Sequence, residues 1–154
     1  MQAMEITSRV IQSIEEKAFD FILVNFANGD MLAHTGNYDA AKIAVKTIDE
    51  AIGKITRSAL ENNAVMIITS DHGNVENMLN PKTGEATTTH DPNPVPIYIA
   101  GNEFVKQKTP AEIELAEKET AGILSDVSPT ILEIMEIPHP KQMTGQSLLK
   151  ILQR

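Results

Sequence analysis

The sequence contains no cysteine, no tryptophan and few aromatic residues. Its 154 residues include 0 Cys, 0 Trp, 2 Tyr and 4 Phe. Without cysteine the chain can form neither a disulfide framework nor a metal site built from thiolates, and this usage fits a reducing compartment. We therefore expect a cytoplasmic protein in which any metal ligands are carboxylate and imidazole groups.

Basic residues are outnumbered by acidic ones. Thirteen Lys and Arg residues stand against 21 Asp and Glu residues, for a net charge of −8. This balance argues against a nucleic-acid or anionic-membrane surface, both of which need basic patches, whereas a surplus of carboxylates suits divalent cations. No apolar run approaches the roughly 20 residues of a membrane-spanning helix, and no charged-then-apolar leader opens the chain. We expect no nucleic-acid partner and no membrane.

The rest of the composition is that of an ordinary globular protein. Hydrophobic residues make up 42% of the chain and charged residues 22%. A chain of about 150 residues buries roughly 68–70% of its unfolded surface, which is enough for one core. The sequence shows no internal repeat, low-complexity tract or linker, so we expect a single domain over residues 1–154.

Apolar residues alternate between helical and strand patterns in the first half of the chain. Helical spacing is found in residues 4–18 and again from Asn37, a suitable N-cap, to about residue 62. Near-continuous apolar runs at 19–28 and 64–69 are typical of strands buried on both faces, as in a parallel sheet. This order predicts a βαβ unit with a right-handed crossover.

The second half is less regular. Residues 80–94, rich in proline and glycine, predict a hairpin-like excursion that ends in an extended loop. Residues 95–101 predict a third strand, and residues 128–137 a short helix with Ser128 as N-cap and Pro129 at the first helical position. The pattern indicates an α/β fold, with the order of strands left open.

Carboxylate and imidazole groups cluster next to all three predicted strands. Asp30 and His34 follow the first strand, Asp71 and His72 end the second, and His90 lies in the loop before the third. Ligands of open α/β sheets gather outside the carboxyl ends of the strands. The first two clusters should therefore meet at one edge of the sheet, within reach of the loop that carries His90.

The spacing of these residues suits metal binding. Asp30 and His34 are four residues apart, so one helical turn points both side chains at one target. Asp71 and His72 are adjacent, and Gly73 permits a bend that lets both serve one site. Carboxylate and imidazole ligands suit Mn²⁺, Zn²⁺ and similar ions. Two such ions, about 3.5–4 Å apart, typically hold a phosphoryl group.

Each motif also has an ordinary structural explanation. Asp30 and His34 alone would fit a solvated turn, the D-H-G sequence a capped turn with Gly73 at positive φ, and His90 a surface loop. The combination favours metal binding, because three of the four histidines fall in loops beside predicted strands. The remaining one, His139, lies between two prolines without a neighbouring carboxylate and is interpreted as a loop residue.

Four segments resemble one known family. The sequences NFANGDMLAHTGN, TSDHGNVENM, HDPNPVPIYIAG and GILSDVSPTILEIMEIPHPKQMTGQSL are similar to the C-terminal part of cofactor-independent (2,3-bisphosphoglycerate-independent) phosphoglycerate mutase, in the alkaline-phosphatase superfamily. The resemblance implies an alkaline-phosphatase-like three-layer sandwich with a mostly parallel sheet, incomplete here. Residues 1–154 would be the C-terminal segment of the metal-binding phosphatase domain.

The family resemblance also implies an activity and a ligand set. The activity is the glycolytic and gluconeogenic interconversion of 3-phosphoglycerate and 2-phosphoglycerate, an isomerisation through a phosphoserine enzyme with two Mn²⁺ ions. Carried over by motif, Asp30, His34 and His90 would bind one ion, and Asp71 and His72 would form part of the shell of the other. Asp91 stands where the family commonly has threonine, and the extra carboxylate is expected to tune the site beside His90.

Several parts of the family pattern have no counterpart in these 154 residues. They are the nucleophilic serine, a further aspartate ligand of the second metal, and the inserted domain that holds the substrate. We therefore expect the chain alone to be inactive, to form at most one good metal site, and to self-associate through an exposed sheet edge.

Two alternatives stay open at this point. The chain could be a piece of another metallo-phosphotransferase of the same superfamily, such as phosphopentomutase, because substrate specificity resides in the missing part. It could instead be a non-catalytic metal-binding or interaction module. The coding sequence upstream of Met1 would discriminate among these readings.

Overall fold

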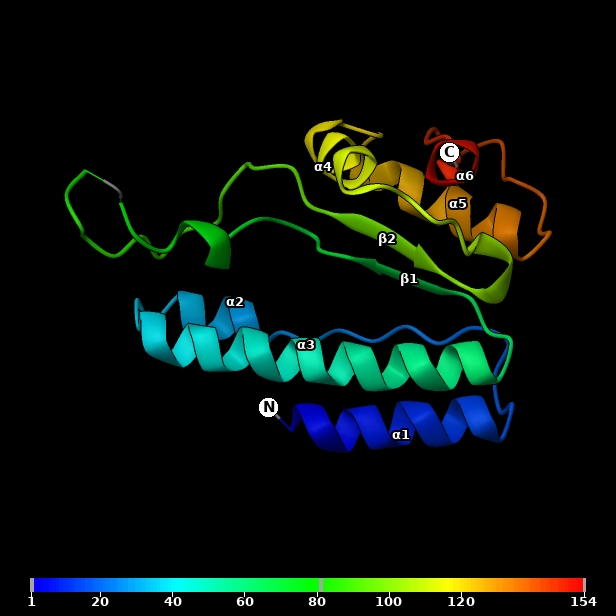
Figure 1. The fold of residues 1–154 in the computed structure, drawn as a ribbon, viewed down its shortest axis with the longest axis horizontal. Coiled ribbons are helices and arrows are strands. Elements are labelled where there is room, and N and C mark those ends of the chain that lie inside the picture. Colours follow the sequence, from blue (N-terminus) through cyan, green and yellow to red (C-terminus); the bar gives the residue numbers. More distant parts are fainter. Residues whose placement is uncertain (1, 81, 154) are drawn as a thin grey trace.

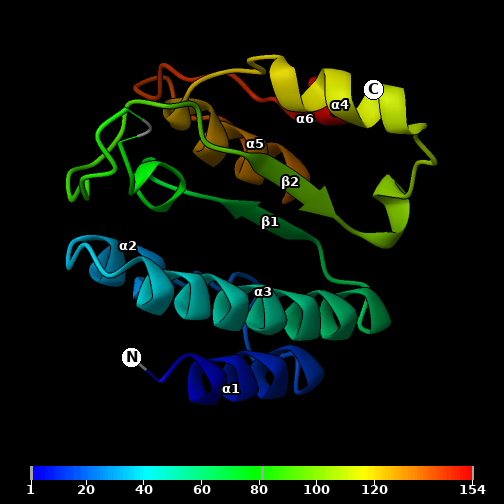
Figure 2. The same cartoon turned by 60° about the vertical axis from the view of Figure 1, so that its left-hand side comes forward.

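A computed structural model describes residues 2–80 and 82–153. A two-stranded sheet lies between a layer of N-terminal helices and a layer of C-terminal helices (Figures 1 and 2). The N-terminal layer consists of α1 (Ala3–Glu15), α2 (Asn28–Ala33) and α3 (Tyr38–Glu61). No helix within the described ranges is both long and apolar enough to cross a membrane.

The two long helices confirm the helical periodicity of the sequence. Helix α3 begins after Asn37, whose side chain accepts the N–H of Ala40 at 3.0 Å, as expected of an N-cap. Its buried positions are mostly alanines, including Ala44 and Ala51, so α1 and α2 can both pack closely against it. This helix is the platform on which α2 is placed.

The strand predicted at 19–28 does not form. Residues 21–26 form an extended segment without regular secondary structure (Figure 1), and residues 19–26 make no backbone hydrogen bond to the rest of the described chain. Alternate side chains do behave as in a strand, since Ile22 and Val24 are half-buried while Phe21 and Leu23 are 51% and 83% exposed. A strand needs a neighbouring backbone to pair with, and no backbone of the described residues is hydrogen-bonded to this segment.

The sheet differs from the expected one. Strands β1 (Met66–Thr69) and β2 (Ile97–Ala100) pair antiparallel, with Ile67 opposite Ile99 and Thr69 opposite Ile97. The predicted parallel βαβ unit is therefore wrong, because its first strand is missing from the sheet. The described residues form helices on both sides of a small antiparallel sheet, and the mostly parallel sheet expected of the three-layer sandwich is not found among them.

The connection between β1 and β2 confirms the predicted excursion. It contains a short 3₁₀ helix, η1 (Val75–Asn77), and a bridge between Leu79 and Ala86, with Gly84 at φ 72° in the turn. Pro81, part of the predicted loop, lies outside the described residues. A second bridge, between Gly73 and Asp91, returns the loop to the end of β1.

The C-terminal layer follows β2. It contains η2 (Asn102–Phe104), α4 (Pro110–Lys118), η3 (Leu124–Asp126), α5 (Val127–Ile134) and α6 (Leu149–Leu152). The predicted cap at Ser128 is wrong by two residues: Asp126 is the N-cap, since η3 leads directly into α5. The Asp126 carboxylate instead accepts the N–H groups of Ile123 and Gln146, at 2.9 and 2.8 Å, and ties the chain end to this layer.

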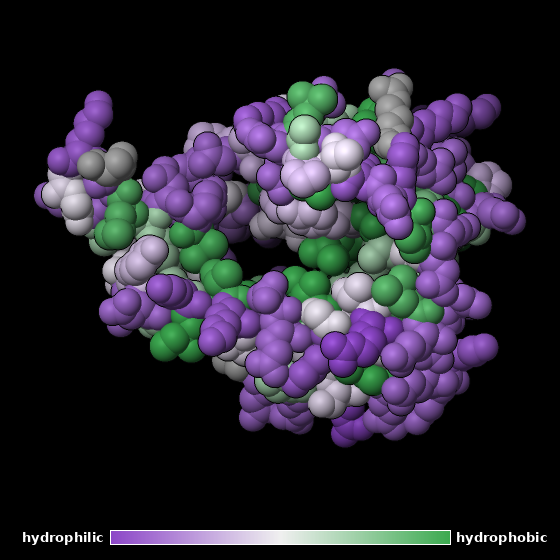
Figure 3. Space-filling view, in the orientation of Figure 1, coloured by the Kyte–Doolittle hydropathy of each residue, from purple (hydrophilic) through white to green (hydrophobic). Residues whose placement is uncertain are grey.

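Open regions of the molecule border apolar residues. Figure 3 shows the molecule hollowed near its centre, with hydrophobic residues around the opening. A separate open groove of about 610 Å³ lies between α1 and the extended segment, lined partly by Ile6, Val10 and Ile22. The extended segment therefore borders apolar surface that the described residues do not cover.

Candidate metal centre

Helix α2 places the first two candidate ligands. It begins directly after the extended segment, with Asp30 in its first turn and His34 immediately after its last residue. Four residues apart, the two side chains share one face, and His34 Nε2 lies 3.2 Å from Asp30 Oδ1. The predicted helical turn at this position is confirmed.

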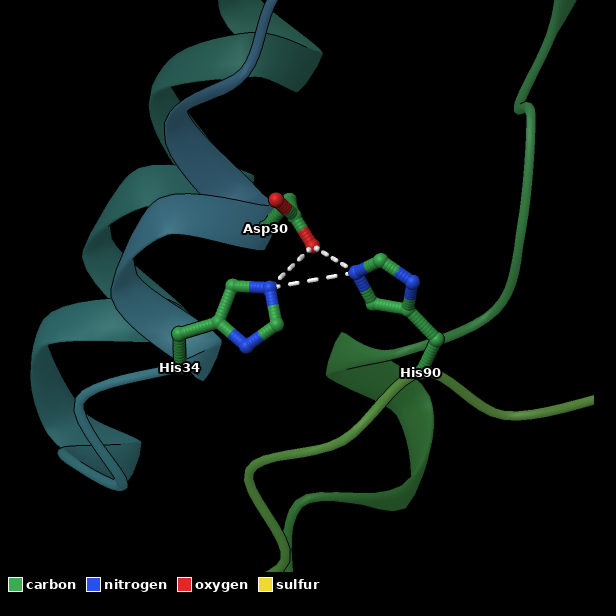
Figure 4. A group of neighbouring side chains, drawn as sticks. All are labelled: Asp30, His34 and His90. Carbon is green, nitrogen blue, oxygen red and sulfur yellow. Dashed lines mark hydrogen bonds and ion pairs between the residues drawn. The ribbon is translucent and has the colours of Figure 1, made fainter.

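The third candidate reaches these two from the long loop. His90 Nε2 lies 3.4 Å from Asp30 Oδ1 and 3.1 Å from His34 Nε2 (Figure 4). The three donor atoms all fall within 4.8 Å of one another, the spacing of a group that can hold a metal ion. The fold thus brings together residues that are 56 positions apart in the chain.

The orientation of His34 is fixed by the same loop. Its Nδ1 lies 2.7 Å from the backbone carbonyl oxygen of Thr88. A carbonyl oxygen only accepts, so Nδ1 carries a proton and, in the neutral ring, Nε2 keeps its lone pair. That lone pair faces Asp30 and His90, which is the arrangement a metal-binding histidine needs. The contact uses the backbone carbonyl of Thr88, so the type of its side chain could not indicate this role.

Asn74 contacts the candidate metal site and was not predicted from the sequence. It is 4% exposed, and its Nδ2 donates to Asp30 Oδ1 at 2.7 Å. This hydrogen bond lowers the pKa of Asp30; burial acts in the opposite direction, and the imidazoles of His34, His72 and His90 add to the lowering. Asp30 is therefore an ionised acceptor near neutral pH. The available signal was the position of Asn74 directly after the D-H-G motif.

The predicted pair Asp71 and His72 lies at the border of this cluster. His72 Nε2 is 4.0 Å from Asp30 Oδ1 and 3.7 Å from Asp71 Oδ1, and the Asp71 side chain is 86% exposed. Within the described ranges Asp71 and His72 belong to no group of three donors as close as that of Asp30, His34 and His90. The structure brings the pair to the same rim but not into an equally compact arrangement.

Gly73 matters to this part of the site because it has no side chain, and not because of a positive φ. Its φ lies outside the left-handed region, so the capped-turn reading is wrong on this point. A Cβ at this position would lie 2.3 Å from Glu76 Oε1 and 3.1 Å from the carbonyl oxygen of Asp91. A side chain here would displace the Glu76 carboxylate and press on the Asp91 carbonyl, so close packing at this point favours glycine.

The donor set fits a divalent ion. Ligand atoms about 2.1 Å from one ion and about 90–110° apart are themselves separated by roughly 3.0–3.4 Å. The three separations among Asp30, His34 and His90 are 3.1, 3.2 and 3.4 Å.

The fourth histidine, His139, contacts the carbonyl oxygen of Gly145 at 3.2 Å, as expected of a loop residue.

Comparisons with known proteins agree with this chemistry. Residues 1–139 match the family model of the metalloenzyme superfamily. The 2,3-bisphosphoglycerate-independent phosphoglycerate mutase of Clostridioides difficile (strain 630) is 44% identical over 149 residues, covering 97% of this chain and 28% of that protein. The same enzyme of Ruthia magnifica subsp. Calyptogena magnifica is 45% identical over 149 residues, covering 97% of this chain and 27% of that protein.

A solved structure also resembles the chain. Phosphoglycerate mutase of Leishmania mexicana, determined at low cobalt concentration, aligns with a TM-score of 0.72 and 25% identity over 95% of this chain and 28% of its own. The chain thus spans little more than a quarter of the length of the relatives it matches. The family model, in contrast, covers most of the chain. The chain belongs to the metalloenzyme superfamily.

Proposed function

We propose that this chain is the metal-binding part of a 2,3-bisphosphoglycerate-independent phosphoglycerate mutase, an isomerase that interconverts 3-phosphoglycerate and 2-phosphoglycerate. The relatives of that name, 44–45% identical over 97% of the chain, support the assignment. The convergence of Asp30, His34 and His90 on one point carries it, because the family resemblance implies metal binding by these same residues.

In this proposal Asp30 Oδ1, His34 Nε2 and His90 Nε2 hold a divalent cation. Mn²⁺ is the ion to test first, and cobalt, present with the Leishmania mexicana enzyme, suits the same oxygen and nitrogen donors. When bound, such an ion neutralises charge on a phosphoryl group as a Lewis acid. Asp71 and His72 are proposed as part of the shell of a second ion, completed by ligands from outside this chain.

The protein groups prepare the site before any ion binds. Asn74 holds Asp30 as an anion, and the carbonyl of Thr88 leaves the Nε2 lone pair of His34 free toward the cation. The Asp71 carboxylate is exposed at the rim, where it could share a second ion with ligands from outside this chain. These groups order the donors and orient the ring of His34.

We further propose that the chain alone does not turn over phosphoglycerate. Ser70, the serine nearest the metal motifs, donates its hydroxyl to the carbonyl oxygen of His72 at 2.8 Å, so it is occupied in a turn. Ser128 lies within α5, in the C-terminal layer. The phosphate-carrying serine of the mutase reaction is therefore assigned to sequence outside these 154 residues.

Calorimetric titration with Mn²⁺ tests the metal assignment. We expect the wild type to bind, His34→Ala to lose more than about tenfold in affinity, and His139→Ala to bind as the wild type does. The His139 variant is the matched control, since it removes an imidazole remote from the candidate site. Equal affinity in the wild type and the His34 variant would refute the assignment.

An activity assay tests the enzymatic part of the proposal. The 154-residue chain loaded with Mn²⁺ should show no mutase activity with 3-phosphoglycerate, while a longer protein that includes the upstream part should show it. Mutase activity in the short chain would contradict the proposed role. Activity of the longer protein on pentose phosphates, without activity on 3-phosphoglycerate, would favour a different enzyme of the superfamily.

A further inference from the structure

We propose that Asp91 is a positioning residue of the metal site, and that its hydrogen bond with Asn77 holds the loop of His90 against the loop of His72. The inference rests on the proposed metal binding by Asp30, His34 and His90. In this inference Asp91 acts by holding two loops together. Its position next to a ligand would by itself suggest that it acts through its negative charge.

Asp91 connects two loops through both its backbone and its side chain. Its N–H donates to the carbonyl oxygen of Gly73 at 2.7 Å, which forms the bridge between the loops. One carboxylate oxygen accepts the N–H of Asn93 at 2.8 Å, and the other accepts a short hydrogen bond from the Asn77 side chain. Both oxygens are thus engaged with donors of the protein.

These contacts lie directly beside the ligand they would position. His90 precedes Asp91 in the chain, and its ring stacks on His72 with centroids 3.7 Å apart and planes 18° apart. The ring stack and the contacts of Asp91 both join the loop of His90 to the loop that begins at β1. His90 and Asp91 are consecutive, and both contact the loop that begins at β1. These contacts restrict the movement of His90 away from Asp30.

A second series of hydrogen bonds connects the loop of Asp91 to Asp30. The Glu76 carboxylate accepts the N–H of Asn74 at 2.8 Å and contacts the side-chain Nδ2 of Asn93 at 3.4 Å. Asn74 in turn donates to Asp30. The loop of Asp91 and the carboxylate of the candidate site are therefore held by one hydrogen-bonded network.

The geometry argues against Asp91 as a direct ligand, and the charge of Asp91 gives a second alternative that experiment can separate. Asp91 is not among the donors that converge in the group of Asp30, His34 and His90, so it is not a fourth member of that group. If it acted only through its negative charge, any added carboxylate nearby would strengthen cation binding. If it acts through its bond to Asn77, a carboxylate in place of Asn77 would weaken binding, because two carboxylates would face each other.

The test exchanges the two partners. Mn²⁺ affinity is measured by calorimetry for the wild type, Asp91→Asn, Asn77→Asp and the double variant. We expect each single variant to bind about tenfold more weakly, and the double variant to recover to within about threefold of the wild type. In the double variant the amide at position 91 donates to the carboxylate at position 77 and still accepts the N–H of Asn93.

The Asn77→Asp variant decides between the two roles. Unchanged or tighter Mn²⁺ binding by this variant, or effects of the two changes that simply add, would overturn the inference. So would a lower melting temperature in the single variants with Mn²⁺ affinity unchanged, since that would make the contact merely structural. The His34→Ala comparison separates the metal assignment from this inference. If His34→Ala binds Mn²⁺ as tightly as the wild type, both the metal assignment and this inference are refuted. If His34→Ala loses affinity but the double variant does not recover it, only this inference is refuted.

Discussion

The imidazoles of His72 and His90 stack on each other, with ring centroids 3.7 Å apart and planes 18° apart. The two residues come from different loops and face the same rim as Asp30. His34 meets His90 at a wider angle, 47°, with centroids 5.0 Å apart. The ring of His90 thus packs face to face on His72, while the Nε2 atom of His34 lies 3.1 Å from the Nε2 atom of His90.

Removing His72 should weaken Mn²⁺ binding less than removing a direct ligand. An aromatic pair contributes about 0.5–1.5 kcal/mol, so His72→Ala should cost roughly twofold to tenfold in affinity. His72→Phe keeps a flat ring and should recover most of that loss. Calorimetric titration of both variants measures the effect; a loss in His72→Phe as large as in His34→Ala would mean that His72 itself binds the first ion.

Gly73→Ala should destabilise the protein by about 1–3 kcal/mol, because Glu76 must move and leave the buried N–H of Asn74 without its acceptor. Urea unfolding measures the loss. Gly53→Ala is the matched control: its Cβ meets nothing within 4 Å inside α3, so it should stabilise by up to about 1 kcal/mol. If the two variants were equally stable, the close approach at Gly73 would have no energetic consequence.

Asp126 should make stability depend on acid pH. Backbone N–H groups of Ile123 and then Gln146 lower the pKa of its carboxyl in the folded protein. Because the folded pKa lies below the unfolded value, the contribution is complete above about pH 4 and is lost as the pH falls through the folded pKa. Asp126→Asn should be less stable than wild type at neutral pH, with a smaller gap in strong acid. Thermal unfolding between about pH 2 and 7 measures this; a gap that widens in acid would contradict it.

The unpaired segment at 19–26 should make the chain self-associate. Leu23 is 83% exposed, and the backbone beside it offers free N–H and carbonyl groups to another strand. Light scattering should show a mass that rises with concentration, and Leu23→Glu should shift it toward the monomer. Ile43→Glu, at an exposed position on α3, is the control and should leave the association unchanged. A constant monomeric mass for the wild type would refute the prediction.

The sequence predicted the helices well because their hydrogen bonds are local. Asn37 caps α3 as expected, and the spacing of Asp30 and His34 indicated the turn that places both on one face. The cap predicted at Ser128 was wrong because η3 leads directly into α5 from Asp126, whose carboxylate accepts the N–H of Gln146, twenty positions along the chain. No local pattern carries that information.

Strand formation failed for a related reason. Residues 21–24 have the composition of a buried strand, but composition does not supply the neighbouring backbone that a strand requires. The same limit applies to the direction of the sheet, because β1 and β2 pair antiparallel through contacts between distant residues. Pairing is a property of two segments together, so it could not be read from either alone.

The sequence by itself determined which residues have metal-binding chemistry: Asp30, His34, Asp71, His72 and His90 were recognised by type and spacing. Only the tertiary structure decided that Asp30, His34 and His90 converge within 4.8 Å while Asp71 stays exposed at the rim. It also decided that Asn74 donates to Asp30, that the Thr88 carbonyl contacts His34, and that Asp91 accepts from Asn77. Side-chain chemistry belongs to each residue, whereas distances of a few ångströms between loops depend on how the whole chain packs.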